Sequence, residues 1–445
     1  MDKSIHELLK KNIRLIDTIR FNEGLDKTSI AQKMGVTWPT ISGHIDSLLE
    51  HNILIRQKDN QIRINNEFGY FFGISVGSAQ IKICILDMGL HLLTADNFLA
   101  FIKDDDVFSE QKNYSTEKGK DIDKYLFSPT PNTEAAIITS INNIFSSIKT
   151  IIERHNKNIL GIGIAFTGAI DKINKKILKS FNIPCFENTA LFGDILLTNY
   201  LDFFETKGIE ITIENNSIAA GVAEKCMLYE EKNLDNSYNI NYKYRNKQNI
   251  INIYLGAGFG LGIIQNNKLY RGSNNLSGGA GHLEVPNFHN NIEAEILIKN
   301  QTNEQNNTQS IDSTCTCGGK NCLDHRVRTD VFNTTFEDFK KWNSNDIFNY
   351  LTTHPEKKDL LGIYLGHLIN LISNLLNPDL IIIGGKLYKS IDDLWGCIQL
   401  KLIENNVKYT KSNCALAKSS FGPLAPAIGA AICAFYGKYD AEIMW

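Results

Sequence analysis

The chain contains 445 residues, of which 43% are hydrophobic and 21% charged, and its formal net charge is -3 at pH 7. One hydrophobic core rarely serves a chain of this length, so two or three domains are expected. The charge excludes a general attraction to nucleic acid or anionic membrane, so any DNA contact must come from a local patch.

The hydropathy pattern predicts a cytoplasmic protein without a membrane partner. No apolar run reaches the roughly 18 residues that span a bilayer. The first twenty residues alternate charged and apolar side chains, which is not the pattern of a secretory signal.

Residues 1–66 are predicted to form a winged helix-turn-helix domain. Apolar side chains over residues 5–19 lie near helical spacing. Asp26 or Thr28 can cap the short helix that follows, and Gly35 suits the tight turn at its end. A second helix comes directly after this turn. Two short helices joined through a glycine turn are typical of the helix-turn-helix arrangement, in which the second helix enters the major groove.

The early outward positions of that second helix are the candidate DNA-binding residues. They are Thr37, Trp38, Thr40, Ser42 and His44. Trp38 either contacts a thymine methyl group or packs on the neighbouring helix, and both alternatives stay open. His44 lies further along the helix, nearer to the phosphates.

A hairpin over residues 53–65 is predicted to form the wing, because apolar and polar residues alternate about a central polar turn. Arg56 and Lys58 then lie on or beside the wing, where they can contact phosphates. Residues 1–70 contain ten Lys and Arg against nine Asp and Glu. Charge alone therefore leaves open a small helical protein-interaction domain.

The rest of the chain carries the same pattern twice. Two apolar strands flank a glycine-bearing turn from Gly69 onward, and a similar pattern returns at residues 249–265. This repetition predicts a duplicated α/β unit. Glycine turns of this kind let backbone N–H groups approach phosphate. Three polar segments are predicted to be surface insertions, at residues 103–132, 229–248 and 286–314.

Together these stretches resemble the ROK family (repressors, open reading frames and kinases). The stretches that carry the resemblance are IENNSIAAGVAE (213–224), LGAGFGLG (255–262), GAGHLEV (279–285), CTCGGKNC (315–322) and NPDLIIIGG (377–385). The resemblance covers nearly the whole chain. It implies an α/β fold in which the winged helix-turn-helix (1–66) precedes a two-lobed, actin-like or hexokinase-like domain (67–445). It also implies a homodimer or homotetramer on double-stranded operator DNA.

Three cysteines within eight residues predict a zinc site of three thiolates, at Cys315, Cys317 and Cys322. A tetrahedral Zn²⁺ needs a fourth ligand, and the resemblance implies His282 for this role. His289 and His325 are the alternatives. A shell of three thiolates and one imidazole is closed and leaves no position for an activated water, so the predicted role is structural.

The resemblance also implies a sugar site formed by Asn215, Asn216, His282 and Asp324. Carboxylates and amides hydrogen-bond to sugar hydroxyls. The alternative for Asn215 and Asn216 is a turn cap before a helix. Gly279 stands where the family has a glutamate, which leaves room for a bulkier substituent or weakens the site.

The sequence departs from the family's kinases at three positions. Asn216 stands where the kinases place the aspartate that acts as general base, and a neutral amide cannot take a proton near pH 7. Ser75 replaces the carboxylate of the first glycine turn, and Ala257 replaces the hydroxyl of the second. We therefore predict a non-enzymatic transcriptional regulator, a repressor that responds to a sugar or sugar derivative. The alternatives are a carbohydrate kinase with an appended domain and a regulator that no longer binds a small molecule.

Overall fold

The N-terminal domain, here called the head, is a winged helix-turn-helix. The computed structural model describes residues 3–22, 24–57, 60–93, 126–155, 157–229, 239–288, 314–405 and 414–438. The head consists of α1 (Lys3–Lys11), α2 (Ile13–Arg20), α3 (Lys27–Met34), α4 (Trp38–Glu50), β1 (Leu54–Arg56) and β2 (Ile62–Ile64). Asp26 caps α3 by accepting the Ser29 N–H, and Gly35 ends it with a left-handed φ of 69°. β1 and β2 pair antiparallel as the predicted wing.

Two five-stranded sheets follow, and they have the same topology. In lobe I the order is β10-β6-β3-β4-β5, and in lobe II it is β13-β12-β11-β14-β15. Each sheet has its first strand in the centre, the next two antiparallel on one side and the last two parallel on the other. This duplication confirms the predicted two-lobed fold. The strands of lobe I are β3 (Tyr70–Val76), β4 (Gln80–Asp87), β5 (Leu126–Pro129), β6 (Ile159–Phe166) and β10 (Glu210–Asn215).

Lobe II contains β11 (Ile250–Leu255), β12 (Phe259–Gln265), β13 (Lys268–Tyr270), β14 (Leu380–Gly385) and β15 (Ala415–Lys418). A third, antiparallel sheet of β7 (Ala169–Asp171), β8 (Lys176–Lys179) and β9 (Glu187–Ala190) extends lobe I. The longer peripheral helices are α7 (Glu134–His155), α8 (Thr198–Thr206), α13 (Ser344–Thr353), α14 (Pro355–Leu376) and α15 (Ile391–Asn405).

α7 and α14 are long and apolar enough to cross a membrane by length and composition alone. Both bury one face against the protein. Phe145 and Ile148 of α7 belong to the core of lobe I, and Leu361 and Leu365 of α14 belong to the core of lobe II. Core helices of this kind pass the same test as membrane spans.

Two helices are exchanged between the lobes. α9 (Asn216–Met227) follows the last strand of lobe I but packs on β11 and β12 of lobe II. α16 (Ala425–Lys438) follows the last strand of lobe II but packs on β3 and β6 of lobe I. The two helices meet where a Cβ at Gly429 would overlap the carbonyl of Ala219. Each lobe is therefore in contact with a helix that follows the last strand of the other lobe.

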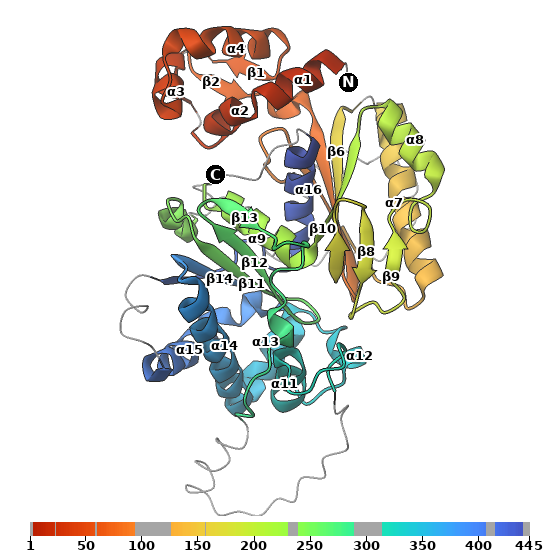
Figure 1. Cartoon of the computed structure of the whole chain (residues 1–445), viewed down its shortest axis with the longest axis vertical. Helices are drawn as coiled ribbons and strands as arrows, with labels where there is room; N and C mark the ends of the chain where they lie inside the picture. The colour runs from red at the N-terminus through yellow and green to blue at the C-terminus, as the bar shows by residue number, and fades with distance from the viewer. Residues whose placement is uncertain are drawn as a thin grey trace, which may run out of the picture.

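The head packs against the end of α16 (Figure 1). Arg20 of α2 donates to the Met88 carbonyl of lobe I at 3.2 Å and lies 4.4 Å from the ring centre of Phe435 in α16. Phe21 stacks near Tyr229 with ring centres 4.4 Å apart. Head and body thus share one continuous hydrophobic core.

The predicted insertions lie partly outside the described residues. Within them, β5 is a paired strand of lobe I, and a 3-10 helix (Ile240–Tyr244) contains the buried Asn241. β5 lies at the edge of its sheet, and the exposed Ile240 is next to the buried Asn241, so the prediction of surface segments stays a prediction. The predicted boundary at residue 66 stays a prediction; a one-turn 3-10 helix (Asn66–Phe68) lies between β2 and β3.

Candidate functional site

A cavity of about 710 Å³ lies between the two lobes. It is lined by the two glycine turns, β3–β4 and β11–β12, by the start of α9 and by segments 275–282 and 340–345. The cavity falls within the range of about 300–1,000 Å³ that is typical of small-molecule sites. All four residues predicted to bind a sugar line it, namely Asn215, Asn216, His282 and Asp324.

The predicted metal ligands converge at one edge of the cavity. The ligand atoms of His282 and the three cysteines lie within 4.8 Å of one another. The Cys317 and Cys322 sulfurs are 3.7 Å apart, and the Cys315 sulfur is 3.7 Å from Nδ1 of His282. Tetrahedral zinc with ordinary bond lengths sets such ligand pairs at about 3.6–3.8 Å. The four side chains therefore fit a metal ion of this kind.

The glycine pair explains how the cysteine loop folds this tightly. Gly318 has a φ of 86°, which L residues rarely adopt. A Cβ at Gly319 would lie 2.9 Å from the Cys322 sulfur. The N–H of Gly319 donates to the Cys317 sulfur at 3.4 Å. That bond offsets part of the negative charge of three thiolates.

Backbone hydrogen bonds join the cysteine loop to the segment that contains His282. The Leu323 N–H donates to the Leu283 carbonyl at 2.9 Å, and the Val285 N–H donates to the Asn321 carbonyl at 2.9 Å. His325 pairs with Arg328 at 3.1 Å and takes no part in the cluster. His289 lies outside the described residues, so the cluster as described contains His282.

Asn215 is the N-cap of α9. Its side-chain oxygen accepts the N–H groups of Ser217 and Ile218, and its amide nitrogen donates to the Gly168 carbonyl at 2.7 Å. The capping alternative therefore describes this residue, although it also borders the cavity.

Asn216 is buried and tied to lobe I. One orientation of its side-chain amide gives both the nitrogen and the oxygen a hydrogen-bond partner. In that orientation the nitrogen donates to the Ala165 carbonyl at 3.0 Å, and the oxygen accepts the Thr167 N–H at 3.3 Å. The Ser75 hydroxyl lies 3.2 Å away. Asn216 thus holds β3, β6 and α9 together at the floor of the cavity.

Asp324 is anchored as well. It is half-buried, and its carboxylate accepts the Phe259 N–H at 2.6 Å. Burial raises the pKa of Asp324 to about 6, although Phe259, His282 and Arg328 oppose this. A Cβ at Gly279 would meet nothing within 4 Å, so the missing glutamate leaves open space beside His282. Across that space the ring of Phe181 from lobe I lies 5.2 Å from the ring of His282.

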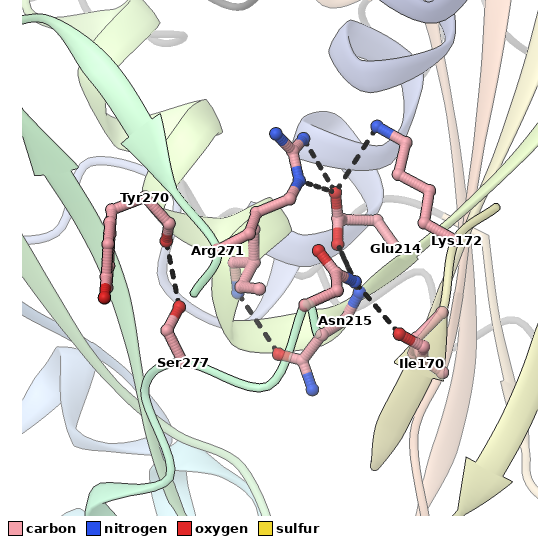
Figure 2. Close-up of polar contacts among 9 residues, drawn as sticks. Ile170, Lys172, Glu214, Asn215, Tyr270, Arg271 and Ser277 are labelled. Carbon is pink, nitrogen blue, oxygen red and sulfur yellow. Dashed lines mark hydrogen bonds and ion pairs between the residues drawn. The ribbon is translucent and has the colours of Figure 1, made fainter. Parts of the chain in front are cut away.

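A charged cluster that the sequence did not reveal joins the lobes beside the cavity. Glu214 of β10 receives Arg271 from lobe II at 2.9 Å and Lys172 at 3.7 Å (Figure 2). Although burial raises it, these two cations hold the pKa of Glu214 below its usual range. Asn275 donates both to Glu214 at 3.3 Å and to the Ile170 carbonyl at 3.1 Å. These contacts, here called the clasp, attach loop 271–278 of lobe II to lobe I through an ion pair and hydrogen bonds.

The only sequence signal for this clasp was Glu214 next to Asn215, because its partners are 42 to 61 residues away. Spacing along the chain cannot reveal such a contact.

The helix predicted to contact bases presents several of its residues to solvent. Thr37 and Thr40 are exposed, and their hydroxyls lie 2.8 Å apart. Ser42 and His44 are half-buried, and Ser42 donates to Asp46 at 3.3 Å. Trp38 packs on the head core with the Lys27 ammonium 4.7 Å from its ring centre, which favours the packing alternative. On the wing, Arg56 is exposed, and Lys58 lies outside the described residues.

Comparison with known proteins decides the family. The sequence pattern of the ROK family matches residues 114–435. The chain belongs to the ROK family. It is 23% identical to the xylose repressor of Bacillus spizizenii over 430 residues, which cover 93% of this chain and 92% of the relative. This ROK chain also resembles the solved structure of a ROK family transcriptional regulator, a homologue of the Escherichia coli MLC protein, with a TM-score of 0.63.

The similarity to this solved ROK regulator, with its TM-score of 0.63, covers 96% of this chain and 97% of the regulator at 14% identity. A ROK glucokinase from Streptomyces griseus, solved with glucose and AMPPNP, has a TM-score of 0.53 and 16% identity. The similarity spans 99% of the kinase but 82% of this chain. The ROK kinase therefore corresponds to a smaller part of the chain than the ROK regulator does.

Proposed function

We propose that the protein is a transcriptional repressor of the ROK family that binds operator DNA and responds to a sugar or sugar derivative. The observation that carries the proposal is a winged helix-turn-helix docked on α16 of a two-lobed domain whose cavity has no general base at position 216. Similarity to a xylose repressor over 93% of the chain supports it. A cytoplasmic homodimer or homotetramer on a palindromic site fits this role.

We propose that the cluster holds zinc. Three thiolates and one imidazole are soft ligands that suit Zn²⁺, and their closed shell serves structure rather than catalysis. Nδ1 of His282 faces Cys315, which leaves Nε2 for a sugar hydroxyl in the cavity. The zinc would therefore hold His282 in one orientation toward the ligand.

A path from the cavity to the head supports a ligand response. Pro423 lines the cavity just before α16, and its carbonyl accepts the Lys82 ammonium at 2.8 Å. Glu224 of α9 accepts the N–H groups of Ser420 and Phe421 in the same turn. The far end of α16 touches the head. A sugar that favours one lobe angle would thereby shift α16 and the position of the head.

Helix α4, which is predicted to enter the major groove, and the wing formed by β1 and β2 are expected to contribute differently to DNA binding. Thr40→Ala should cost about 1–3 kcal/mol on the operator and little on random DNA, because base contacts carry specificity. Arg56→Ala should weaken binding to the operator and to random DNA alike, because it removes a phosphate contact. The slope of the logarithm of the binding constant against the logarithm of the salt concentration should fall by about one unit in magnitude. Selection from random DNA supplies the operator, and fluorescence anisotropy at several salt concentrations measures both effects.

Two substitutions in the same domain serve as controls. Thr18→Ala and Arg14→Ala alter α2, which lies outside the recognition helix and the wing. Neither should change specificity. Absence of any sequence preference in the selection, with and without sugars, would instead favour the protein-interaction alternative for the head.

The protein is expected to be inactive as a sugar kinase. Asn216 is neutral, and Asp324 is the one carboxylate among the described residues that line the cavity. Asn216→Asp alone should not create a kinase, because it would also lose the N–H that Asn216 donates to the Ala165 carbonyl, and the phosphate-side differences at Ser75 and Ala257 remain. A coupled ATP assay over a panel of sugars tests this. Turnover at ordinary rates of roughly 1 per second or more would establish the kinase alternative.

A thermal-shift series with the same sugars addresses the third alternative. A ligand that binds the folded state raises the unfolding midpoint. A panel of sugars and sugar phosphates that produces no shift would indicate a regulator without a small-molecule response.

A further inference from the structure

The loop that the clasp attaches to lobe I is also a wall of the cavity. Residues 275–279 of lobe II line the cavity, and residues 167–169 of lobe I line it too. The side-chain amide of Asn275 donates to the carbonyl of Ile170, the next residue of lobe I, at 3.1 Å. The two walls therefore meet at the clasp, and the cavity is closed there by a contact between the lobes.

The ion pair of the clasp lies outside the cavity lining and is buried on one side only. Nε of Arg271 donates to a carboxylate oxygen of Glu214 at 3.0 Å, and Nη2 lies 2.9 Å from the same oxygen (Figure 2). The Glu214 side chain is 1% exposed, whereas those of Arg271 and Lys172 are 24% and 32% exposed. The buried acceptor limits screening of the pair by salt. Arg271, in contrast, can exchange its partner for water without crossing the core.

The loop is a compact unit that is fixed firmly to lobe II. The Ser277 N–H donates to the Arg271 carbonyl at 3.0 Å, which closes the loop on itself. Gly278 has a φ of 93°, and a Cβ there would lie 2.2 Å from the carbonyl oxygen of Leu261 in β12. Within the described ranges, the polar contacts of this loop with lobe I are those of the clasp. Loss of the clasp would therefore free the loop from lobe I but not from lobe II.

We propose that the clasp is a gate between the lobes, which holds the empty cavity closed and opens when Arg271 leaves Glu214. A ligand in the cavity need not displace the ion pair, because neither residue belongs to the lining. In the open state Lys172 remains beside Glu214, since both belong to lobe I, so the buried carboxylate keeps a counter-ion. The fraction of open molecules then sets how fast the cavity admits and releases a small molecule.

Hydrogen exchange of the full chain, without added sugar or DNA, tests the gate. Arg271→Met keeps the apolar stem of the side chain and removes the cation. Amides of residues 271–278 should then exchange about 10- to 100-fold faster than in the wild type, because the closed state that protects them is less populated. Small-angle scattering should show a larger radius of gyration, because the lobes move apart about the contact of α9 and α16.

Lys172→Met is the matched control. It also removes a cation from Glu214, but from a side chain of the same lobe, so both measurements should stay near those of the wild type. A role in charge neutralisation alone would instead make the two variants alike, and that result overturns the gate.

A third variant separates the gate from a loss of stability. Arg271→Met leaves Glu214 with one cation, which can lower the stability of lobe I. Glu214→Gln combined with Arg271→Met removes that charge and should keep both effects, at about the size seen in Arg271→Met, because the two residues act as one pair. Wild-type exchange in both variants overturns the gate. Faster loop exchange at an unchanged radius of gyration also overturns it, because the ion pair would then order the loop without holding the lobes. Neither result depends on the proposed function, since the samples contain no sugar or operator.

Discussion

Cys317→Ser is expected to abolish metal binding and to destabilise lobe II more than any other single substitution considered. The wild type should contain about one zinc per chain, and the variant close to none, because a tetrahedral site with three remaining ligands and a hydroxyl binds Zn²⁺ far less tightly. Structural zinc in small domains contributes about 10–16 kcal/mol of apparent binding energy, which is folding energy wherever the site forms only on folding. Elemental analysis and denaturant unfolding measure the two effects.

Loss of the metal should first disorder the two segments that it joins, before the whole of lobe II unfolds. Backbone contacts of Asn321, Cys322 and Leu323 join segments 280–285 and 314–323, so proteolysis is expected to begin in these segments once the metal is lost. Cys185→Ser is the matched control, because this exposed cysteine lies outside the cluster. A wild type that is purified without metal and unfolds at the same denaturant concentration after chelation would refute a structural zinc.

The predictions that succeeded rest on short-range patterns or repetition. The cap at Asp26, the turn at Gly35 and the spacing of the three cysteines each use neighbouring residues whose geometry is set by backbone chemistry. The two glycine turns indicated a duplication, and both sheets show it. The resemblance placed His282, which spacing alone did not distinguish from its alternatives.

What could not be predicted depends on contacts between distant segments. The Glu214–Arg271 ion pair and the exchange of α9 and α16 each join elements that are far apart in sequence. Hydrophobic periodicity says which face of an element is buried but not which partner covers it. The role of Asn215 as a helix cap was foreseen only as an alternative, because a cap and a ligand-binding amide look alike in sequence.

The contact between head and body leads to a second prediction, at Arg20. Its side chain is buried, pairs with Asp17 in the same helix and reaches Met88 and Phe435 of the body. Arg20→Met keeps the length and apolar stem of the side chain but removes the cation. Asp17 then loses its partner, and removal of one member of a buried pair typically costs about 3–5 kcal/mol. The head is expected to detach from the body before the body unfolds.

Three measurements distinguish this detachment from general damage. Denaturant unfolding of Arg20→Met should show an earlier transition for the head, and proteases should cut near residues 66–69. Operator binding should persist while its dependence on a sugar effector weakens, because α16 no longer positions the head. Arg14→Met, an exposed arginine of the same helix, is the control and should leave all three unchanged. Asp17→Asn combined with Arg20→Met should recover part of the stability, because it removes the uncompensated charge. A single transition at the wild-type midpoint, with the sugar response intact, would show that Arg20 does not couple the head to α16.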